Sequence, residues 1–182
     1  MANESNERKV IIAILLTSTL LTMLGIAGVL RGAYDLSLAP LPEDVRELYD
    51  PEADVTDAEV QLLEAQVTNP YRRPLAAANV VASALVLIGS FMLSWRRKLA
   101  LWWIRQAVVA KLIWIAVYTV SLVSHVKMSF APLALDNPDA ALPEVIGGVI
   151  LVSTFSGALH VAAAYRATRP DIAEFITSNA KP

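Results

Sequence analysis

Long apolar runs alternate with charged stretches along the chain. Three of these runs carry no formal charge, and they cover residues 10–30, 76–95 and 145–165. A helix needs about 20 apolar residues to cross the hydrocarbon core of a bilayer. Because backbone polar groups cannot be left unbonded in lipid, runs of this length predict transmembrane helices rather than loops or open sheets.

A fourth run, residues 99–125, is equally apolar in outline but carries Arg105 and Lys111. As a helix it would be about 40 Å long, which exceeds a hydrocarbon core of about 30 Å. We therefore expect its first turns, with Arg105, to lie in the headgroup layer and the rest to cross the membrane. The predicted fold class is an all-α integral membrane protein, a four-helix transmembrane bundle that forms a single four-pass domain over residues 1–182.

The first apolar run has two interpretations. Arg8 and Lys9 precede it and small residues lie near its end, as in a cleaved signal peptide. The run is longer than the apolar region of a signal peptide, which spans about 7 to 15 residues. We therefore expect a signal anchor, so that the first predicted helix stays in the protein.

Residues 31–75 form an acidic outer segment interrupted by prolines. Pro42, followed by two acids, favours the first turn of a short amphipathic helix over residues 42–49. A second short helix is predicted to begin at the capping box of residues 56–59 and to stop at Asn69. Its apolar face, the candidate partner-binding surface, consists of Val60, Leu63 and Val67. We expect this face to lie on the outer ends of the bundle or on a partner protein.

The distribution of basic residues predicts the orientation. With the N-terminus inside, eight Lys and Arg residues fall in the inner stretches and five in the outer ones. Basic residues in short loops stay on the cytoplasmic side, so both termini are expected in the cytoplasm. The absence of Cys and of a transit-peptide composition favours a bacterial inner membrane.

Each predicted span carries polar and small residues at helical spacing, which places them on one face. These stripes are Ser18, Thr22 and Gly25 on the first span; Asn79, Ser83, Ser90 and Ser94 on the second; Lys111, Trp114, Tyr118, Ser121 and His125 on the third; and Ser153, Ser156, Gly157 and His160 on the fourth. One interpretation is close packing with hydrogen bonds between helices in lipid. The other is a hydrated bundle interior, for which the candidate path residues are Lys111, Tyr118, His160 and Asn79.

Lys111 itself has two interpretations. Its ammonium can snorkel toward the cytoplasmic interface with no further role. Alternatively, it can face a polar interior and handle an anion or a proton, because ionisable groups inside membranes are often functional. His160 is predicted at a depth close to that of Lys111, so the two side chains can face each other across the bundle.

The predicted cytoplasmic tail covers residues 166–182. Pro170 followed by Asp171 is typical of a helix start. Ile172, Phe175 and Ile176 would share the apolar face of this helix. Because a helix of about ten residues is marginal alone, we expect it to dock on a partner.

No motif in the sequence indicates catalysis, a cofactor or a metal site. The chain has no Cys, which excludes disulfides, thiolate nucleophiles and thiolate metal ligands. Two lone His residues lack the further ligands that zinc requires. The acidic cluster of residues 50–59 lacks the turn glycine of a calcium loop. A net charge of -2 gives no support for a nucleic-acid partner.

The leading prediction of function is a non-enzymatic accessory or structural subunit of a membrane complex. Its partners would be the lipid bilayer and other membrane subunits, or further copies of the chain. The alternative is an ion, proton or small-solute transporter or channel with a polar path between the helices. A membrane enzyme ranks third, because no loop brings together a nucleophile, a base and a metal motif.

Overall fold

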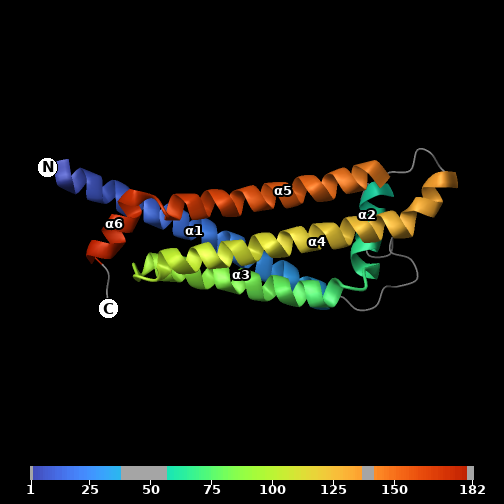
Figure 1. Cartoon of the computed structure of the whole chain (residues 1–182), viewed down its shortest axis with the longest axis horizontal. Coiled ribbons are helices and arrows are strands. Elements are labelled where there is room, and N and C mark those ends of the chain that lie inside the picture. The colour runs from blue at the N-terminus through green and yellow to red at the C-terminus, as the bar shows by residue number, and fades with distance from the viewer. Residues whose placement is uncertain (1, 38–56, 137–141, 180–182) are drawn as a thin grey trace, which may run out of the picture.

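The computed structural model describes residues 2–37, 57–136 and 142–179 of the chain (Figure 1). Its long helices are α1 (Ala2–Ser37), α3 (Arg72–Ser94), α4 (Ala100–Asp136) and α5 (Leu142–Ala167). Each contains a stretch long and apolar enough to cross a membrane, and the described ranges contain no strand. The predicted all-α class with four membrane-spanning helices is therefore confirmed. The short helix predicted over residues 42–49 and the acidic residues 50–56 lie outside the described residues.

The long helices extend beyond the apolar runs that predict them. α1 continues to Ser37 and α4 to Asp136, while α3 begins at Arg72. Apolar runs report which residues tolerate lipid, whereas helical hydrogen bonding can continue through polar residues at the membrane surface. In the added turns of α1, Arg31 and Asp35 lie one turn apart and form an ion pair with 3.3 Å between Nε and Oδ1. Part of the predicted outer segment is therefore helix.

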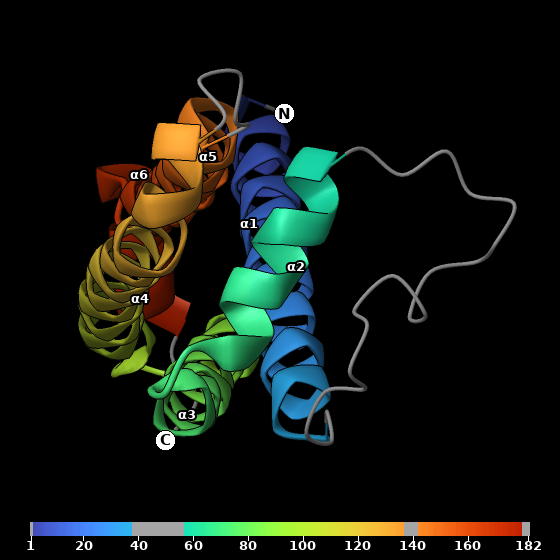
Figure 2. The same cartoon turned by 90° about the vertical axis from the view of Figure 1, so that its right-hand side faces the viewer.

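The long helices are arranged as a bundle in which neighbours follow the order α1, α3, α4 and α5, with a less extensive contact between α1 and α5. Figure 1 shows α2 across one end of the bundle and α6 near the opposite end, where both termini lie. We call these the α2 end and the α6 end. Figure 2 views the bundle from the α2 end, with α1, α3, α4 and α5 following one another around it.

Helix α2 (Asp57–Thr68) is the helix predicted from the capping box, and it packs on the chain's own bundle. Its buried face is centred on Ala65, with Leu62 beside it. These residues contact a cluster of Leu122, Val126, Val145 and Val149 from α4 and α5. Leu63 and Val67 are half-buried at the edge of this face, and the side chain of Val60 lies outside the described residues. Of the two expected surfaces, α2 therefore covers the bundle.

Helix α6 (Pro170–Asn179) begins at the predicted proline and also packs on the bundle. Ile172 and Ile176 are buried among side chains of the long helices, and Phe175 packs beside them. The apolar face expected to dock on a partner therefore lies on this chain. Tertiary packing stabilises a helix that would be marginal alone.

The turn between α3 and α4 has a helix-ending geometry usually built with glycine. The N–H of Arg97 donates to the carbonyl of Met92 at 2.9 Å, and that of Arg96 donates to Leu93 at 3.0 Å. This pair of bonds defines a Schellman motif, whose left-handed position favours Gly. Here Arg96 occupies that position with a φ of 53°. Its guanidinium lies 5.1 Å from the centre of the Phe175 ring, so the turn contacts α6.

Two apolar clusters fill the bundle, and polar side chains lie between them. The α6-end cluster includes Val10, Ile14, Leu21, Leu93, Ile104, Ile172 and Ile176. The α2-end cluster contains Ala65, Leu122, Val126, Val145 and Val149. Between the two clusters lie the buried side chains that we call the polar layer, Asn79, Ser83, Lys111 and His160. Large apolar side chains such as Leu151 and Phe155, each more than half exposed, face outward, as expected where lipid is the solvent.

Candidate functional site

The ammonium of Lys111 lies in the interior of the bundle. Only 3% of the side chain surface is exposed. Nζ donates hydrogen bonds to Oδ1 of Asn79 and, at 2.8 Å, to Oγ of Ser83. It also lies 4.4 Å from the centre of the Trp114 ring, within the range of a cation–π contact. Two helices, α3 and α4, thus supply all of these contacts.

The residues around Lys111 hold one another in place. Nδ2 of Asn79 donates to the carbonyl of Gly28 at 3.1 Å, and Oγ of Ser83 donates to Oδ1 of Asn79 at 3.3 Å. A Cβ at Gly28 would lie 3.0 Å from Nζ of Lys111 and would clash with Oγ of Ser83. Glycine at this position therefore lets α1 approach α3 closely enough for the Asn79 bond.

The depth of Lys111 distinguishes its two interpretations. Lys111 follows the first residue of α4, Ala100, by about 16 Å along the helix. Asn79, its acceptor, follows Arg72 by about 10 Å, which places the ammonium toward the α2 end. A lysine that only snorkelled to the α6 end would reach in the opposite direction. Arg105, by contrast, is exposed near the start of α4, as a residue at headgroup depth would be.

In the described part of the chain, the charge of Lys111 has no carboxylate partner. Its bonded neighbours are an amide, a hydroxyl and an indole ring, all of which are neutral. Neutral dipoles replace only part of the hydration that a buried ion loses, and removing an ion from water costs several kcal/mol. Lys111 at this position therefore destabilises the fold, which indicates that its charge has a function.

His160 of α5 is the second buried ionisable side chain of the polar layer, with 2% of its surface exposed. Its Nδ1 lies 2.8 Å from the carbonyl of Ser156, and since a carbonyl only accepts, Nδ1 carries the proton. In the neutral ring Nε2 then has a free lone pair. Among the described residues Nε2 is buried and has no hydrogen-bond partner.

A cavity of about 360 Å³ joins these groups. Its polar lining includes Lys111, Tyr118, His160 and Asn79, so all four candidate path residues meet at one place. Ser153 and Ser156 of α5 add hydroxyl groups, while aliphatic side chains such as those of Leu24, Ile115 and Val152 form apolar wall. Such a mixture of apolar surface and a few convergent polar groups is typical of small-molecule sites.

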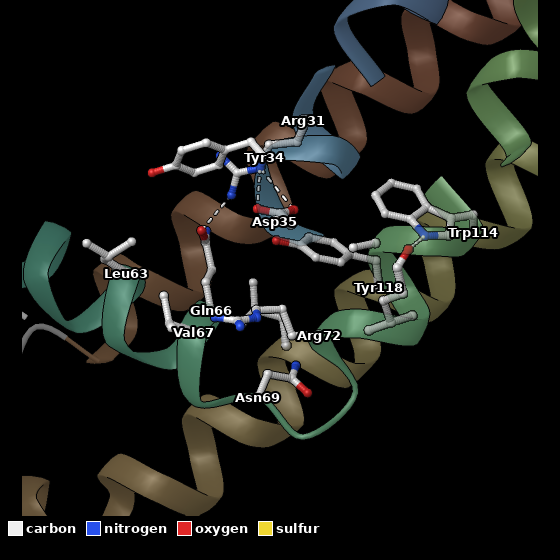
Figure 3. Close-up of a pocket in the computed structure, with 13 residues that line it drawn as sticks. Arg31, Tyr34, Asp35, Leu63, Gln66, Val67, Asn69, Arg72, Trp114 and Tyr118 are labelled. Carbon is white, nitrogen blue, oxygen red and sulfur yellow. Dashed lines mark hydrogen bonds and ion pairs between the residues drawn. The ribbon is translucent and has the colours of Figure 1, made fainter. Parts of the chain in front are cut away.

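A second cavity of about 240 Å³ lies beneath α2 (Figure 3). Nη2 of Arg31 donates to Oε1 of Gln66 at 2.6 Å, which ties α1 to α2. Figure 3 shows the Tyr118 hydroxyl pointing toward Asp35, the ion-pair partner of Arg31. Arg31, Asp35, Gln66, Trp114 and Tyr118 line both cavities. The two cavities are therefore adjacent, and together they extend from α2 to the polar layer.

Sequence reasoning placed Arg31, Asp35 and Gln66 in the outer segment and assigned them no role. Their contribution depends on α1 continuing past its apolar run and on α2 folding back over the bundle. The spacing of Arg31 and Asp35, four residues apart with opposite charges, was the available signal for the extra helical turn. No local pattern indicates that Gln66 would meet them.

Other members of the polar stripes form bonds between helices. A hydrogen bond of 2.8 Å between Oγ1 of Thr22 and Oγ of Ser90 joins α1 to α3. Near the α2 end, Thr68 is 3.0 Å from Nε2 of His125, and Asn69 donates to Ser121 at 3.3 Å. Packing explains these residues, as the first interpretation of the stripes predicts. The middle of the bundle differs, because there an ammonium and an imidazole lone pair face a cavity.

No family model, curated protein or solved structure matches the chain. Within the described ranges, no three side chains of the types that ligate metals lie together. The geometry of the polar layer and its cavity is therefore the basis for a function.

Proposed function

We propose that the protein is a non-enzymatic membrane transport protein that receives a small solute in the interior of its bundle. One observation carries this proposal: the Lys111 ammonium is buried against neutral groups on the wall of a 360 Å³ cavity. A fold that only needed to hold helices together would be served at lower free-energy cost by an apolar side chain of the same length. The site therefore supports transport better than a purely structural role.

The two adjacent cavities suggest the direction from which a solute enters. They lie between α2 and the polar layer, whereas the α6-end cluster closes the bundle beyond it. In the proposed function this arrangement is the state that accepts a solute from the α2 end. Release at the α6 end would require the helices around Leu93 and Ile104 to separate.

Flux into liposomes tests this proposal. The reconstituted protein would be offered a carboxylate, an amine, a neutral alcohol and chloride in turn, and we expect uptake of at least one. Lys111→Met should lower that uptake at least about tenfold, because it removes charge-assisted bonds. Lys127→Met is the matched control, since Lys127 is an exposed lysine of the same helix, and its uptake should stay unchanged. Full uptake by Lys111→Met would contradict the proposal.

An accessory subunit is the second candidate function. The observation that favours it concerns α5, of whose apolar window only 17% is buried, compared with 28% to 39% for the other spans. Gly147 and Gly148 of this helix have open space where a Cβ would point, so another helix can approach closely. Cross-linking in native membranes from α5, followed by affinity purification, would recover a stoichiometric foreign subunit. Recovery of the chain alone or as a homo-oligomer would count against this candidate.

We also propose that the α6 end faces the cytoplasm of a bacterium with the protein in its inner membrane. Both termini lie at this end, and so does the turn with Arg96, Arg97 and Lys98. Because the chain has no Cys, single cysteines can be introduced one at a time. In intact cells with a permeable outer membrane, an impermeant maleimide should label Thr68→Cys at the end of α2 but not Ser178→Cys in α6. The opposite pattern would reverse the orientation.

A further inference from the structure

We infer that the solute of the central cavity is a small monocarboxylic acid with an apolar tail, bound together with its proton between Lys111 and His160. This inference rests on the proposed function and names the class of substrate for the same site. A carboxylate oxygen would accept from Lys111 Nζ, and the acid proton would lie on or beside His160 Nε2. Charge, hydrogen-bonding capacity and the apolar wall each support this assignment.

The lining of the cavity offers one unpaired cation to a ligand. Among the described residues that line it, the charged groups are Lys111, Arg31 and Asp35. Arg31 is already paired with Asp35 at 3.3 Å, and it donates a further bond to Gln66. The ammonium of Lys111 is therefore the cation of the lining that has no anionic partner. A carboxylate would pair with this ammonium, whereas a phosphate monoester would bring further oxygens for which the ammonium leaves no donor.

The hydrogen-bonding groups of the site match a carboxylic acid rather than a simple anion. An ammonium has three N–H donors, and those of Lys111 that bond Asn79 and Ser83 leave one for a ligand. His160 contributes an acceptor. Its Nδ1–H donates to the carbonyl of Ser156, and its Nε2 can accept a proton. Carboxylic acids carry both an oxygen acceptor and a proton donor on one carbon. Chloride can satisfy Lys111 but not His160.

The rest of the cavity favours an apolar tail. Leu24 and Ala27 of α1, Ile115 of α4 and Val152 of α5 contribute apolar surface. A volume of about 360 Å³ lies at the small end of the range for ligand pockets, about 300 to 1,000 Å³. A short aliphatic acid fits this combination of size and surface, while a sugar acid or an amino acid would bury unpaired polar groups.

The proton balance is explicit. In solution near neutral pH the ligand is the carboxylate, so binding of the acid takes up one proton from water. If the O–H bond of the acid breaks, the N–H bond of His160 Nε2 forms, and the carboxylate stays paired with Lys111. Among the described residues of the lining, the other titratable groups are Tyr118, Arg31 and Asp35. Helices α2 and α3 contribute only the amides of Gln66 and Asn79 to it. Asp35 is the competing proton acceptor.

Calorimetric binding to the purified full-length protein tests the inference. Hexanoate is the probe, and hexanol, hexylamine, hexyl phosphate and acetate are the comparison ligands. We expect hexanoate to bind at least about tenfold more tightly than each of them. Hexanol and hexylamine lack the anionic oxygen, acetate lacks the apolar tail, and hexyl phosphate brings oxygens for which Lys111 leaves no donor. Equal binding of hexanol would show simple partition into an apolar space, and tighter binding of hexyl phosphate would show a phosphate site. Either result, or no binding of hexanoate, overturns the inference.

The proton is measured by repeating the titration in buffers with different heats of ionisation. The native protein and Asp35→Asn should both take up about one proton per hexanoate bound. His160→Leu should bind hexanoate more weakly and take up none, and Lys111→Met should lose at least about tenfold in affinity. Lys127→Met is again the control. Proton uptake that survives His160→Leu and disappears in Asp35→Asn would overturn the assignment of His160.

The ligand series uses the native protein, so it decides the inference even if a variant does not fold. Binding and transport also fail separately. Hexanoate binding without flux in liposomes would leave the ligand class standing and contradict the proposed function. Flux of an amine or alcohol without hexanoate binding would leave the proposed function standing and contradict the ligand class.

Discussion

The α6-end half of the bundle and the half that contains the polar layer are built from the same four long helices but filled differently. In the first half, Leu21, Leu93, Ile104, Ile172 and Ile176 are almost fully buried in one apolar cluster. In the second half, an ammonium and an imidazole are buried as deeply, and two cavities adjoin them. Apolar packing therefore closes the interior at the α6 end, whereas the smaller α2-end cluster leaves two cavities beside the polar layer.

This difference indicates a division of roles. Close packing at the α6 end fixes the relative positions of the helices, because a densely packed interior is hard to compress. Burying the polar layer costs free energy, and the apolar packing at the α6 end offsets that cost. If the two halves have these roles, substitutions in the α6-end half should change stability alone. Substitutions in the half with the polar layer should change stability and ligand binding together.

The largest effect is expected for Asn79→Leu. This change removes an acceptor from Lys111 and a donor from the carbonyl of Gly28. Leaving a charged group without its partner should destabilise the fold by about 3 kcal/mol, measured by unfolding in SDS–detergent mixtures. The double variant Asn79→Leu with Lys111→Met should recover most of this loss, because both members of the bond are then apolar. An equally unstable double variant would show that Lys111 does not depend on Asn79.

A smaller loss is expected for Ile176→Ala in the apolar half. Ile176 is 1% exposed, and truncating it leaves a cavity between α6 and the bundle. We expect about 2 kcal/mol, at the lower limit for such substitutions, because a short terminal helix can settle into the gap. Hexanoate binding should stay unchanged. Thr177→Ala, one residue on and exposed, should change the free energy of unfolding by less than about 0.5 kcal/mol. A change in binding would contradict the separation of the two halves.

A paired glycine experiment separates close approach from helix propensity. Gly28→Ala adds a Cβ that clashes with Ser83, and we expect a net loss of about 1 kcal/mol together with weaker binding at Lys111. Gly147→Ala adds the same methyl where no atom lies within 4 Å, so it should stabilise the fold by about 0.5 kcal/mol through helix propensity. If the two variants behaved alike, the contact of α1 with α3 at Gly28 would not be as close as described.

The smallest effect is expected at the α3–α4 turn. Arg96→Gly relieves a left-handed conformation, worth about 1 kcal/mol, but removes the contact with the Phe175 ring, worth about 0.5 to 1 kcal/mol. The net change in unfolding free energy should therefore be close to zero. In a Phe175→Leu background the same change should stabilise the fold, because only the backbone benefit remains. No gain in that background would mean that the left-handed position is not strained.

The fold was largely predictable because a single local property, a long run without charge, sets three of the four spans. A charge-free run such as residues 76–95 or 145–165 has no alternative to a helix in lipid. The ends of the helices were less predictable, since apolar residues stop at Leu30 but the backbone bonding of α1 continues to Ser37. The residues that α2 buries against the bundle were also less predictable. Ala65 is the fully buried residue of α2, while Leu63 and Val67 line the cavity beneath the helix.

The candidate site was predictable as a set of residues but not as a geometry. Helical spacing placed Lys111 and Tyr118 on one stripe, Asn79 on another and His160 on a third. Whether the Lys111 ammonium turned inward depended on Gly28, which permits α1 to approach and supplies a carbonyl to Asn79. Spacing within one helix carries no information on such contacts between helices. Whether these residues form a transport path stays a prediction.

The packing of α6 has a consequence for biogenesis. The α6-end cluster combines Val10 and Ile14 from α1 with Ile172 and Ile176 from α6. Among the described helices, α1 leaves the ribosome first and α6 last, so this part of the interior cannot be completed while synthesis continues. A chain whose translation stops after α5 would present the start of α1 uncovered, and a membrane quality-control protease could distinguish it from the finished protein by that surface.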